Sequence, residues 1–267
     1  MKKIKANIGR PFKLIAAIVV IIAIIITAGL IFAQYLKSLS FFTIKEIIVK
    51  DNNRIDLSYL KGKNIFNIDL SRESLYAWRM YPVYKRIRLI RVLPNRIYVD
   101  FAKRKPMALV KINNRYFAVD EGAIFFDAGL ILDARDPGWI NLPLILGLGH
   151  KIPNPRSGTK YYVSELGVGL RLIRDMTKIR ICRDFRLISI DLSNADSLLL
   201  QFSLPSLAGS GIVEVKLGRE DTGTRIRILA GLLYRFKKDW NSVKYIDLRF
   251  KEPVIRFNEI SKLKKGD

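Results

Sequence analysis

The sequence predicts an α+β protein made of a single transmembrane helix, a small α+β module and a mainly antiparallel β domain flanked by helices. Three observations lead to this fold class. A run of twenty uncharged residues lies near the N-terminus. A strand–helix–helix–strand–strand pattern follows it, and short alternating strands interrupted by two amphipathic helices complete the chain.

Residues 14–33 contain no charged side chain and only one hydroxyl group, that of Thr27. As a helix this run would reach roughly 30 Å, which is the thickness of the hydrocarbon core of a bilayer. A cleavable signal has a shorter apolar region and a small residue before its cleavage site, where this chain has Ile31. We therefore expect a retained membrane anchor whose residues 14–33 contact lipid, rather than a removable signal or a buried core helix.

The flanks of this run predict its orientation. Residues 1–13 carry five lysines and arginines and no acidic residue, whereas the twenty residues after Ala33 carry three lysines. The excess of positive charge belongs on the cytoplasmic side of a membrane. Residues 1–13 are thus expected to be a cytoplasmic tail, and the large C-terminal part is expected to be periplasmic or extracytoplasmic.

The formal net charge of +23 indicates an acidic partner or a highly solvated surface. Nucleic acid would be the first candidate in a cytosolic protein, but export removes it, and stacking aromatic residues are not interleaved with the basic runs. Anionic lipid headgroups or acidic wall polymers remain as partners. The basic runs are Lys85, Arg86, Arg88 and Arg91, and Lys103, Arg104 and Lys105.

The first module is predicted from residues 41–105. Residues 41–50, "FFTIKEIIVK", are rich in β-branched and aromatic residues and predict a strand. A short helix ending at Gly62 and a second helix between Asp69 and Pro82 follow. The segments "YKRIRLIRVL" and "RIYVDFAKR" then predict two strands joined at residues 94–95. Ile44, Ile47 and Val49 could face a core, and Ile97, Val99 and Phe101 alternate with Tyr98 and Asp100. Leu75 and either Trp78 or Arg79 have helical spacing.

The second domain is predicted as a sheet with two helices. Strands are expected at "MALVKI", "RYFAVD", "AIFF", "FRLISIDL", "SLLLQFSL" and "GIVEVKLG", and a strand pair, "VKYIDLRF" and "PVIRF", closes the chain. One helix is expected over residues 163–178. The apolar stripe of the other has helical spacing: Ile226, Leu229, Leu233, Phe236 and Trp240.

Few residues in the chain are suited to catalysis. His150 lies in a Gly-rich loop without the context of a catalytic triad, and a solvated loop histidine is the alternative. Cys182 is flanked by Arg180 and Arg183, which would favour a reactive thiolate, or it is a small apolar residue that fills space. With one His and one Cys, we expect no metal site, and "GVG" at 167–169 lacks the context of a phosphate loop. We therefore expect no catalytic, cofactor-binding or metal-binding residues.

Several motifs, taken in order, resemble the bacterial cell-division protein family FtsQ, also called DivIB. "FFTIKEIIVKDNN" is similar to the opening strand of the POTRA domain of that family. Pro82 and Pro94 are twelve residues apart, and "KRKPMA" matches a Glu-Arg-x-Pro-x-Ala ending, with Lys103 in place of Glu. "FAVDEGAIF", "LPLILG" and "VKYIDLRFKEPVIRF" match later motifs, although the last turn is shorter and carries Pro253.

The resemblance implies a POTRA domain at residues 41–107, an FtsQ-type β domain at 108–258 and a flexible tail at 259–267. It implies a non-enzymatic cell-division scaffold in the inner membrane at the septum. The β domain would bind FtsB, which comes with FtsL, and would help to control septal peptidoglycan synthesis. No nucleic acid, small-molecule substrate or cofactor is implied.

The final strand suggests how such a partner is held. A C-terminal strand with no later strand to cover it presents unpaired backbone N–H and C=O groups, to which an extended segment can add. Pro253 cannot donate a hydrogen bond, so it should begin the strand or face away. The candidate partner-binding residues are Arg249, Phe250, Val254, Ile255, Arg256 and Phe257.

Two other functional classes remain open from the sequence alone. A membrane-anchored enzyme acting on the cell wall would carry convergent acids or a nucleophile with its base. A component of envelope assembly or transport would normally need several POTRA copies or a long β-barrel with amphipathic strands. Neither pattern is visible in the sequence.

Overall fold

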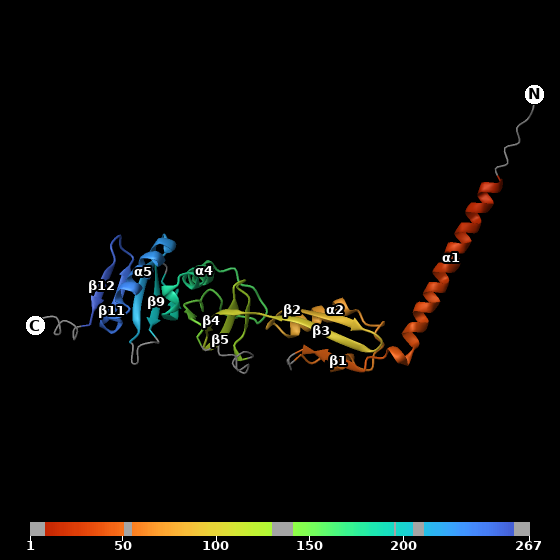
Figure 1. Cartoon of the computed structure of the whole chain (residues 1–267), viewed down its shortest axis with the longest axis horizontal. Coiled ribbons are helices and arrows are strands. Elements are labelled where there is room, and N and C mark those ends of the chain that lie inside the picture. Colours follow the sequence, from red (N-terminus) through yellow and green to blue (C-terminus); the bar gives the residue numbers. More distant parts are fainter. Residues whose placement is uncertain (1–8, 51–54, 130–140, 195, 205–210, 259–267) are drawn as a thin grey trace, which may run out of the picture. The chain divides into compact units, whose positions relative to one another are not determined.

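A computed structural model describes residues 9–50, 55–129, 141–194, 196–204 and 211–258. The chain divides into two compact units, residues 1–102 and residues 103–267 (Figure 1). The expected turn at residues 51–53, the loop 130–140 and the expected flexible tail at 259–267 lie outside the described residues. So does most of the expected cytoplasmic tail.

The N-terminal apolar run is a single long helix, α1 (Gly9–Ser38). Within it, Ile15–Leu36 is long and apolar enough to cross a membrane, and among the described residues it is the one helix that meets this criterion. Its side chains are exposed, which suits contact with lipid and not burial in a protein core. The helix extends beyond the predicted 14–33 at both ends. At its start, Pro11 is tolerated because it lies in the first turn, where its missing N–H breaks no hydrogen bond.

The remainder of the first unit is a three-stranded sheet with helical segments. The sheet order is β1-β3-β2, and β1 runs parallel to β3. The strand–helix–helix–strand–strand order is therefore confirmed, although the first helix is a single 3-10 turn. The elements are β1 (Glu46–Val49), η3 (Ser58–Leu60), α2 (Leu70–Met80), β2 (Tyr84–Val92) and β3 (Arg96–Lys103).

The predicted strand at 41–50 is too long. Residues Ser40–Phe42 form the 3-10 turn η1, and Thr43 makes only an isolated bridge to Asn64. The backbone of Ile44 is instead bound by the 62–63 segment: Ile44 N–H donates to Lys63 O at 2.9 Å, and Gly62 N–H donates to Ile44 O at 3.0 Å. Pairing with this loop keeps the start of the segment out of the sheet.

The core of the first unit contains most of the predicted residues. Ile44, Ile97 and Val99 are buried, and Ile47, Val49, Trp78 and Phe101 pack against them half-buried. Leu75 lies in α2, as its helical spacing predicted, but it is 47% exposed and does not face the core. The face of α2 that packs on the sheet instead contains Leu70 and Ala77, and Asp69 caps the helix by accepting from the N–H groups of Ser71 and Arg72.

The second unit contains a nine-stranded sheet in the order β12-β11-β10-β9-β8-β7-β4-β5-β6. Antiparallel pairing dominates, as predicted; β10–β11, β7–β8 and β4–β7 are parallel. β7 was not expected as a strand. The strands are β4 (Pro106–Ile112), β5 (Arg115–Asp120), β6 (Phe125–Asp127), β7 (Leu144–Leu146), β8 (Arg186–Asp191), β9 (Ser197–Ser203), β10 (Val213–Gly218), β11 (Val243–Leu248) and β12 (Val254–Phe257).

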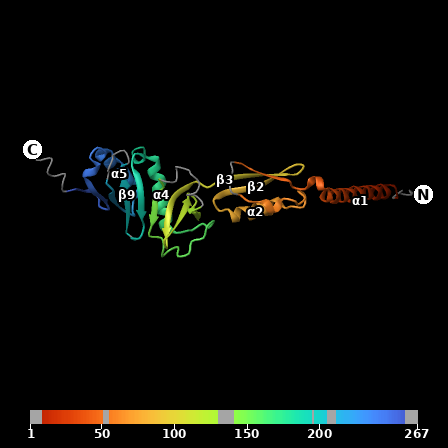
Figure 2. The ribbon, with the colours of Figure 1, turned by 90° about the horizontal axis from the view of Figure 1, so that it is seen from below.

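Two helices, α4 (Ser164–Lys178) and α5 (Thr222–Phe236), contact each other and pack against the sheet (Figures 1 and 2). The apolar stripe of α5 is confirmed at its first three positions, Ile226, Leu229 and Leu233, which are buried. Its last predicted member, Trp240, is fully buried but lies beyond the helix, in the turn Trp240–Ser242. Its ring packs edge-on against Phe185 at 4.7 Å.

A buried ion pair lies at the start of the second unit. Arg104 Nη1 is 2.8 Å from Asp120 Oδ2, and both side chains are almost fully buried. The other oxygen of Asp120 accepts hydrogen bonds from the N–H groups of Gly122 and Ile124. A buried charge is tolerated when it is paired and its remaining hydrogen-bonding capacity is used. Two of the motifs noted above, "KRKPMA" and "FAVDEGAIF", thus meet in one structural contact.

Candidate functional site

The two edges of the nine-stranded sheet differ. At the β6 edge, the backbone is covered by residues 158–161 of the same chain. Phe125 N–H donates to Thr159 O at 3.0 Å, Gly158 N–H donates to Phe125 O at 2.7 Å, and Tyr161 N–H donates to Ala123 O at 3.1 Å. This edge has no room for an added strand.

The β12 edge is open among the described residues. β12 pairs antiparallel with β11 and has no strand on its other side. Asn258 N–H donates to Ser242 O at 2.8 Å, which fixes the direction of the backbone groups. Alternate residues of a strand point their N–H and C=O groups to the same side. The backbone groups of Arg256, two residues before Asn258, therefore also face β11. The N–H and C=O groups of Ile255 and Phe257 therefore point away from the sheet.

The side chains of β12 alternate between two faces. Ile255 packs half-buried against the core of the second unit, and the Phe257 ring meets Phe236 of α5 edge-on at 5.7 Å. Phe257 nevertheless remains 38% exposed. Val254 and Arg256 lie on the opposite face and are exposed. The predicted start at Pro253 is confirmed, because β12 begins at the next residue.

The turn between β11 and β12 places the other two candidate residues. The Arg249 guanidinium binds Asp247 with two nitrogens, Nε at 3.0 Å from Oδ1 and Nη2 at 2.7 Å from Oδ2. It also lies 5.6 Å from the centre of the Phe250 ring, which is 56% exposed. Arg225 Nη1 donates to Phe250 O at 2.6 Å and fixes the turn to α5.

These contacts separate the roles of the two arginines that were expected to meet acidic groups on a partner. The Arg249 charge is already paired within the chain, where it orients the turn and the Phe250 ring. Among the described residues, no carboxylate forms an ion pair with Arg256, whose side chain is exposed. The charge of Arg256 is thus available to a partner.

The Asp247 contact makes the turn sensitive to acid. Hydrogen bonds from Arg249, first from its side chain and then from its N–H, hold the pKa of Asp247 below its ordinary value, although burial opposes this. A lowered carboxyl pKa adds stability that is fully present above the unfolded-state pKa, near 3.9, and is lost as the pH falls through the folded-state value. Above that window the pair stabilises the turn.

We expect Asp247→Asn to lower the free energy of unfolding at pH 7 by about 1–3 kcal/mol, because it leaves the Arg249 guanidinium without its charged partner. The charge of Asp247 is lost progressively as the pH falls toward and through its lowered pKa, so at pH 2 the variant and the native protein should differ less than at pH 7. Urea unfolding in detergent at both pH values measures this. Asp175→Asn, which removes an exposed ion pair with Lys178, is the control and should change stability little at either pH.

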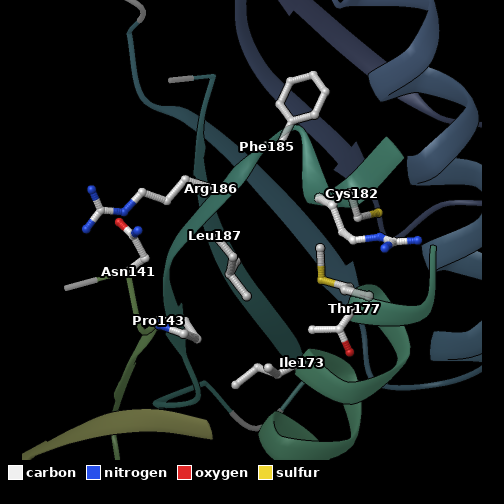
Figure 3. Close-up of a pocket in the computed structure, with 10 residues that line it drawn as sticks. Asn141, Pro143, Ile173, Thr177, Cys182, Phe185, Arg186 and Leu187 are labelled. Carbon is white, nitrogen blue, oxygen red and sulfur yellow. The ribbon is translucent and has the colours of Figure 1, made fainter. Parts of the chain in front are cut away.

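A separate surface pocket of about 400 Å³ lies beside the C-terminal half of α4 (Figure 3). Arg186 and Asn141 lie on one side of it, and Cys182 and Thr177 lie on the other. Burial raises the pKa of the Cys182 thiol to about 11, opposite to the lowering that its flanking arginines would cause. Cys182 therefore has the properties of a small apolar residue and not of a nucleophile.

The remaining candidates for chemistry are dispersed. His150 lies in an exposed turn, and Gly167 and Gly169 lie inside α4. Within the described ranges, no group of three or more metal-binding side chains comes together. The basic runs also divide: Arg104 is buried in its ion pair, and Arg91 donates to the carbonyls of Ile65 and Ile68. Arg104 is therefore not available to a ligand, whereas Arg91 stabilises the fold and stays exposed.

Comparison with known proteins shows similarity to bacterial proteins named Cell division protein FtsQ. That of Syntrophotalea carbinolica is 24% identical over 252 residues, covering 90% of this chain and 81% of the relative. That of Geotalea daltonii is 22% identical over 240 residues, covering 85% and 80%. That of Rickettsia bellii is 32% identical over 89 residues, about a third of each chain. No protein-family model matches the sequence.

Proposed function

The chain belongs to the FtsQ family of cell division proteins, and from this premise we propose that it is a non-enzymatic scaffold of the division septum. In this proposal α1 anchors the chain in the inner membrane with its N-terminus in the cytoplasm. The part of the first unit that follows α1 and the whole second unit are exported. The resemblance to the family implies FtsB as the partner of the second unit, together with FtsL, and control of septal peptidoglycan synthesis as the outcome.

The observation that carries this proposal is the difference between the two sheet edges. The β6 edge is covered by the chain itself, whereas β12 pairs only with β11 among the described residues. An extended partner segment that aligns with β12 can hydrogen-bond to the outward N–H and C=O groups of Ile255 and Phe257. Such strand addition derives affinity from the backbone and selectivity from the side chains beside it.

The side chains around β12 define the partner segment. Val254 and Phe257 lie on opposite faces of the strand and are both partly exposed, and Phe250 is exposed at the turn. They favour a partner strand with apolar residues on both faces. Arg256 favours an acidic group on the face that also carries Val254. Aromatic residues near the centre of an interface contribute most of its binding energy, so Phe257 is the principal anchor.

We expect Phe257→Asp to weaken binding of FtsB, alone or with FtsL, by roughly thirtyfold or more, the loss typical of an interface hot spot. The substitution removes the apolar anchor and places a carboxylate where the partner must be desolvated. Isothermal titration calorimetry on the full chain in detergent, with the FtsB and FtsL proteins of the same organism, measures it.

Two variants serve as controls for this experiment. Tyr234→Asp adds the same charge at a residue of α5 that is 77% exposed, and it should leave binding unchanged. Phe257→Leu keeps an apolar side chain and should lose less affinity than Phe257→Asp. An unchanged affinity of Phe257→Asp, in a protein with native thermal stability, would refute the assignment of this edge.

A further inference from the structure

The end of the first unit that follows α1 carries exposed apolar and basic side chains. We call it the basal end, and define it as η1, the loop 61–64 and the turn 93–95 between β2 and β3, with Lys45. Backbone hydrogen bonds join these segments: Ile44 N–H donates to Lys63 O, and Lys45 N–H donates to Asn95 O, both at 2.9 Å. Both views of the ribbon show the β2–β3 turn at this end of the unit (Figures 1 and 2).

Two large apolar side chains are exposed there. Phe41 is 62% exposed and Leu93 is 59% exposed, although each lies within a folded segment. Phe41 is held by the edge-on contact of its ring with Phe42 at 5.3 Å, and Phe42 in turn packs against Phe66 at 5.0 Å. Phe41 therefore projects from a packed group of aromatic rings.

Three exposed lysines accompany them. Among the described residues, no carboxylate forms an ion pair with Lys45, Lys61 or Lys63. Of the described acids close in sequence, Glu46 binds Arg96 at 3.0 Å and Asp69 caps α2. Asp56 accepts from the N–H group of Ser58 at 2.9 Å, and its charge also interacts with that of Lys61. The basal end thus combines net positive charge with apolar tips, which is the composition of a surface that binds at a lipid–water interface.

The chain itself places this end beside a membrane. The span Ile15–Leu36 has 22 residues, which corresponds to about 33 Å of helix and so to the full hydrocarbon thickness. η1 begins at Ser40, four residues after the span ends, and Asn64 Nδ2 donates to the carbonyls of Leu36 and Leu39 at 3.2 and 3.1 Å. Tyr35, exposed in the last turns of α1, is typical of the headgroup level.

We propose that the basal end docks into the headgroup layer of the membrane that α1 crosses, with Phe41 and Leu93 inserted and Lys45, Lys61 and Lys63 paired with anionic lipid. Such docking would restrict how the exported units move about their anchor. The inference depends on α1 being a transmembrane helix and is independent of the partner at β12. The occupant of this surface is anionic lipid, because the surface is joined directly to the lipid-facing helix and has the complementary charge.

The test uses the full chain reconstituted in nanodiscs, with a spin label at Leu93→Cys in a Cys182→Ala background. Collision rates with oxygen, which partitions into lipid, and with a water-soluble nickel chelate report the depth of the label. In nanodiscs of phosphatidylcholine with phosphatidylglycerol, oxygen collisions should dominate at Leu93→Cys. Nickel collisions should dominate at the control Tyr162→Cys, a residue of the second unit that is 86% exposed. Equal exposure of the two labels to nickel would overturn the proposal.

A second experiment tests whether docking requires the charges of the three lysines. Lys45→Gln, Lys61→Gln and Lys63→Gln together should lower the ratio of docked to undocked protein by roughly tenfold to a hundredfold in the anionic nanodiscs. Phosphatidylcholine alone should have the same effect on the native chain. Lys160→Gln, Lys238→Gln and Lys244→Gln remove the same charge from exposed positions of the second unit and should change nothing. A label that stays immersed in the first triple variant would contradict the assignment of anionic lipid.

Discussion

Ile255→Pro is expected to abolish partner binding at the β12 edge while the second unit remains folded. The N–H group of Ile255 points away from β11, so its loss breaks no hydrogen bond within the sheet. A partner strand, by contrast, needs this N–H group as a donor and would meet the proline ring in its place. The expected loss of affinity is at least a hundredfold, because both the hydrogen bond and the close approach of the two backbones are removed.

Ile255→Ala is the matched control. It removes the half-buried side chain that packs against the core but keeps the N–H group, so it should cost about tenfold or less in affinity. Calorimetry with FtsB and FtsL measures both variants, and thermal unfolding in detergent shows whether each is folded. Equal losses in the proline and alanine variants would mean that the side chain, and not strand addition, carries the binding.

The open edge was predictable from the sequence only in part. Alternating residues in "VKYIDLRF" and "PVIRF" predicted the final strand pair, and no strand signal follows it. The covered β6 edge was not predictable, because more than thirty residues of the chain separate Phe125 from residues 158–161, which pair with it. Pairing between segments so far apart depends on the complete fold and has no local sequence signal.

The side-chain contacts of the candidate binding residues were also predictable only in part. Phe257 was predicted as a partner-binding residue from the sequence. Its contact with Phe236 was not predicted, because it joins two elements with separate periodicities and no local pattern indicates it. The Asp247–Arg249 ion pair could have been predicted from the sequence, because residues two apart on a strand share a face. It was missed because the resemblance to the family directed Arg249 toward a partner.

The basal end of the first unit was the least predictable feature. Phe41, Lys63 and Leu93 are separated by 22 and 30 residues, and each looks like an ordinary surface or strand residue in its own segment. Backbone hydrogen bonds between segments that are distant in sequence bring them together, among them those of Lys63 and Asn95 with residues 44–45. The local periodicities that predict strands and helices contain no information on which turns lie at the same end of a module.

Gly147→Ala is expected to lower the free energy of unfolding of the second unit by about 3–5 kcal/mol. Gly147 ends β7 with a φ of +85°, a conformation that is strained for any residue with a Cβ atom. An added Cβ would also collide with the backbone N of Ser193 and approach its Oγ to 2.6 Å and its Cα to 2.8 Å. The two costs add because one methyl group causes both.

Ser193 has little freedom to move away from that methyl group. Its N–H and its hydroxyl both donate to Asp191 Oδ1, at 2.8 and 2.6 Å, and the neighbouring Leu192 N–H donates to Leu146 O. Gly231→Ala is the opposite case, because Gly231 lies inside α5 and its Cβ would meet nothing within 4 Å. That change should stabilise the unit by about 1 kcal/mol. Urea unfolding in detergent measures both changes in the free energy of unfolding, which should have opposite signs. A Gly147→Ala variant as stable as Gly231→Ala would show that the β7–β8 connection can rearrange around the added atom.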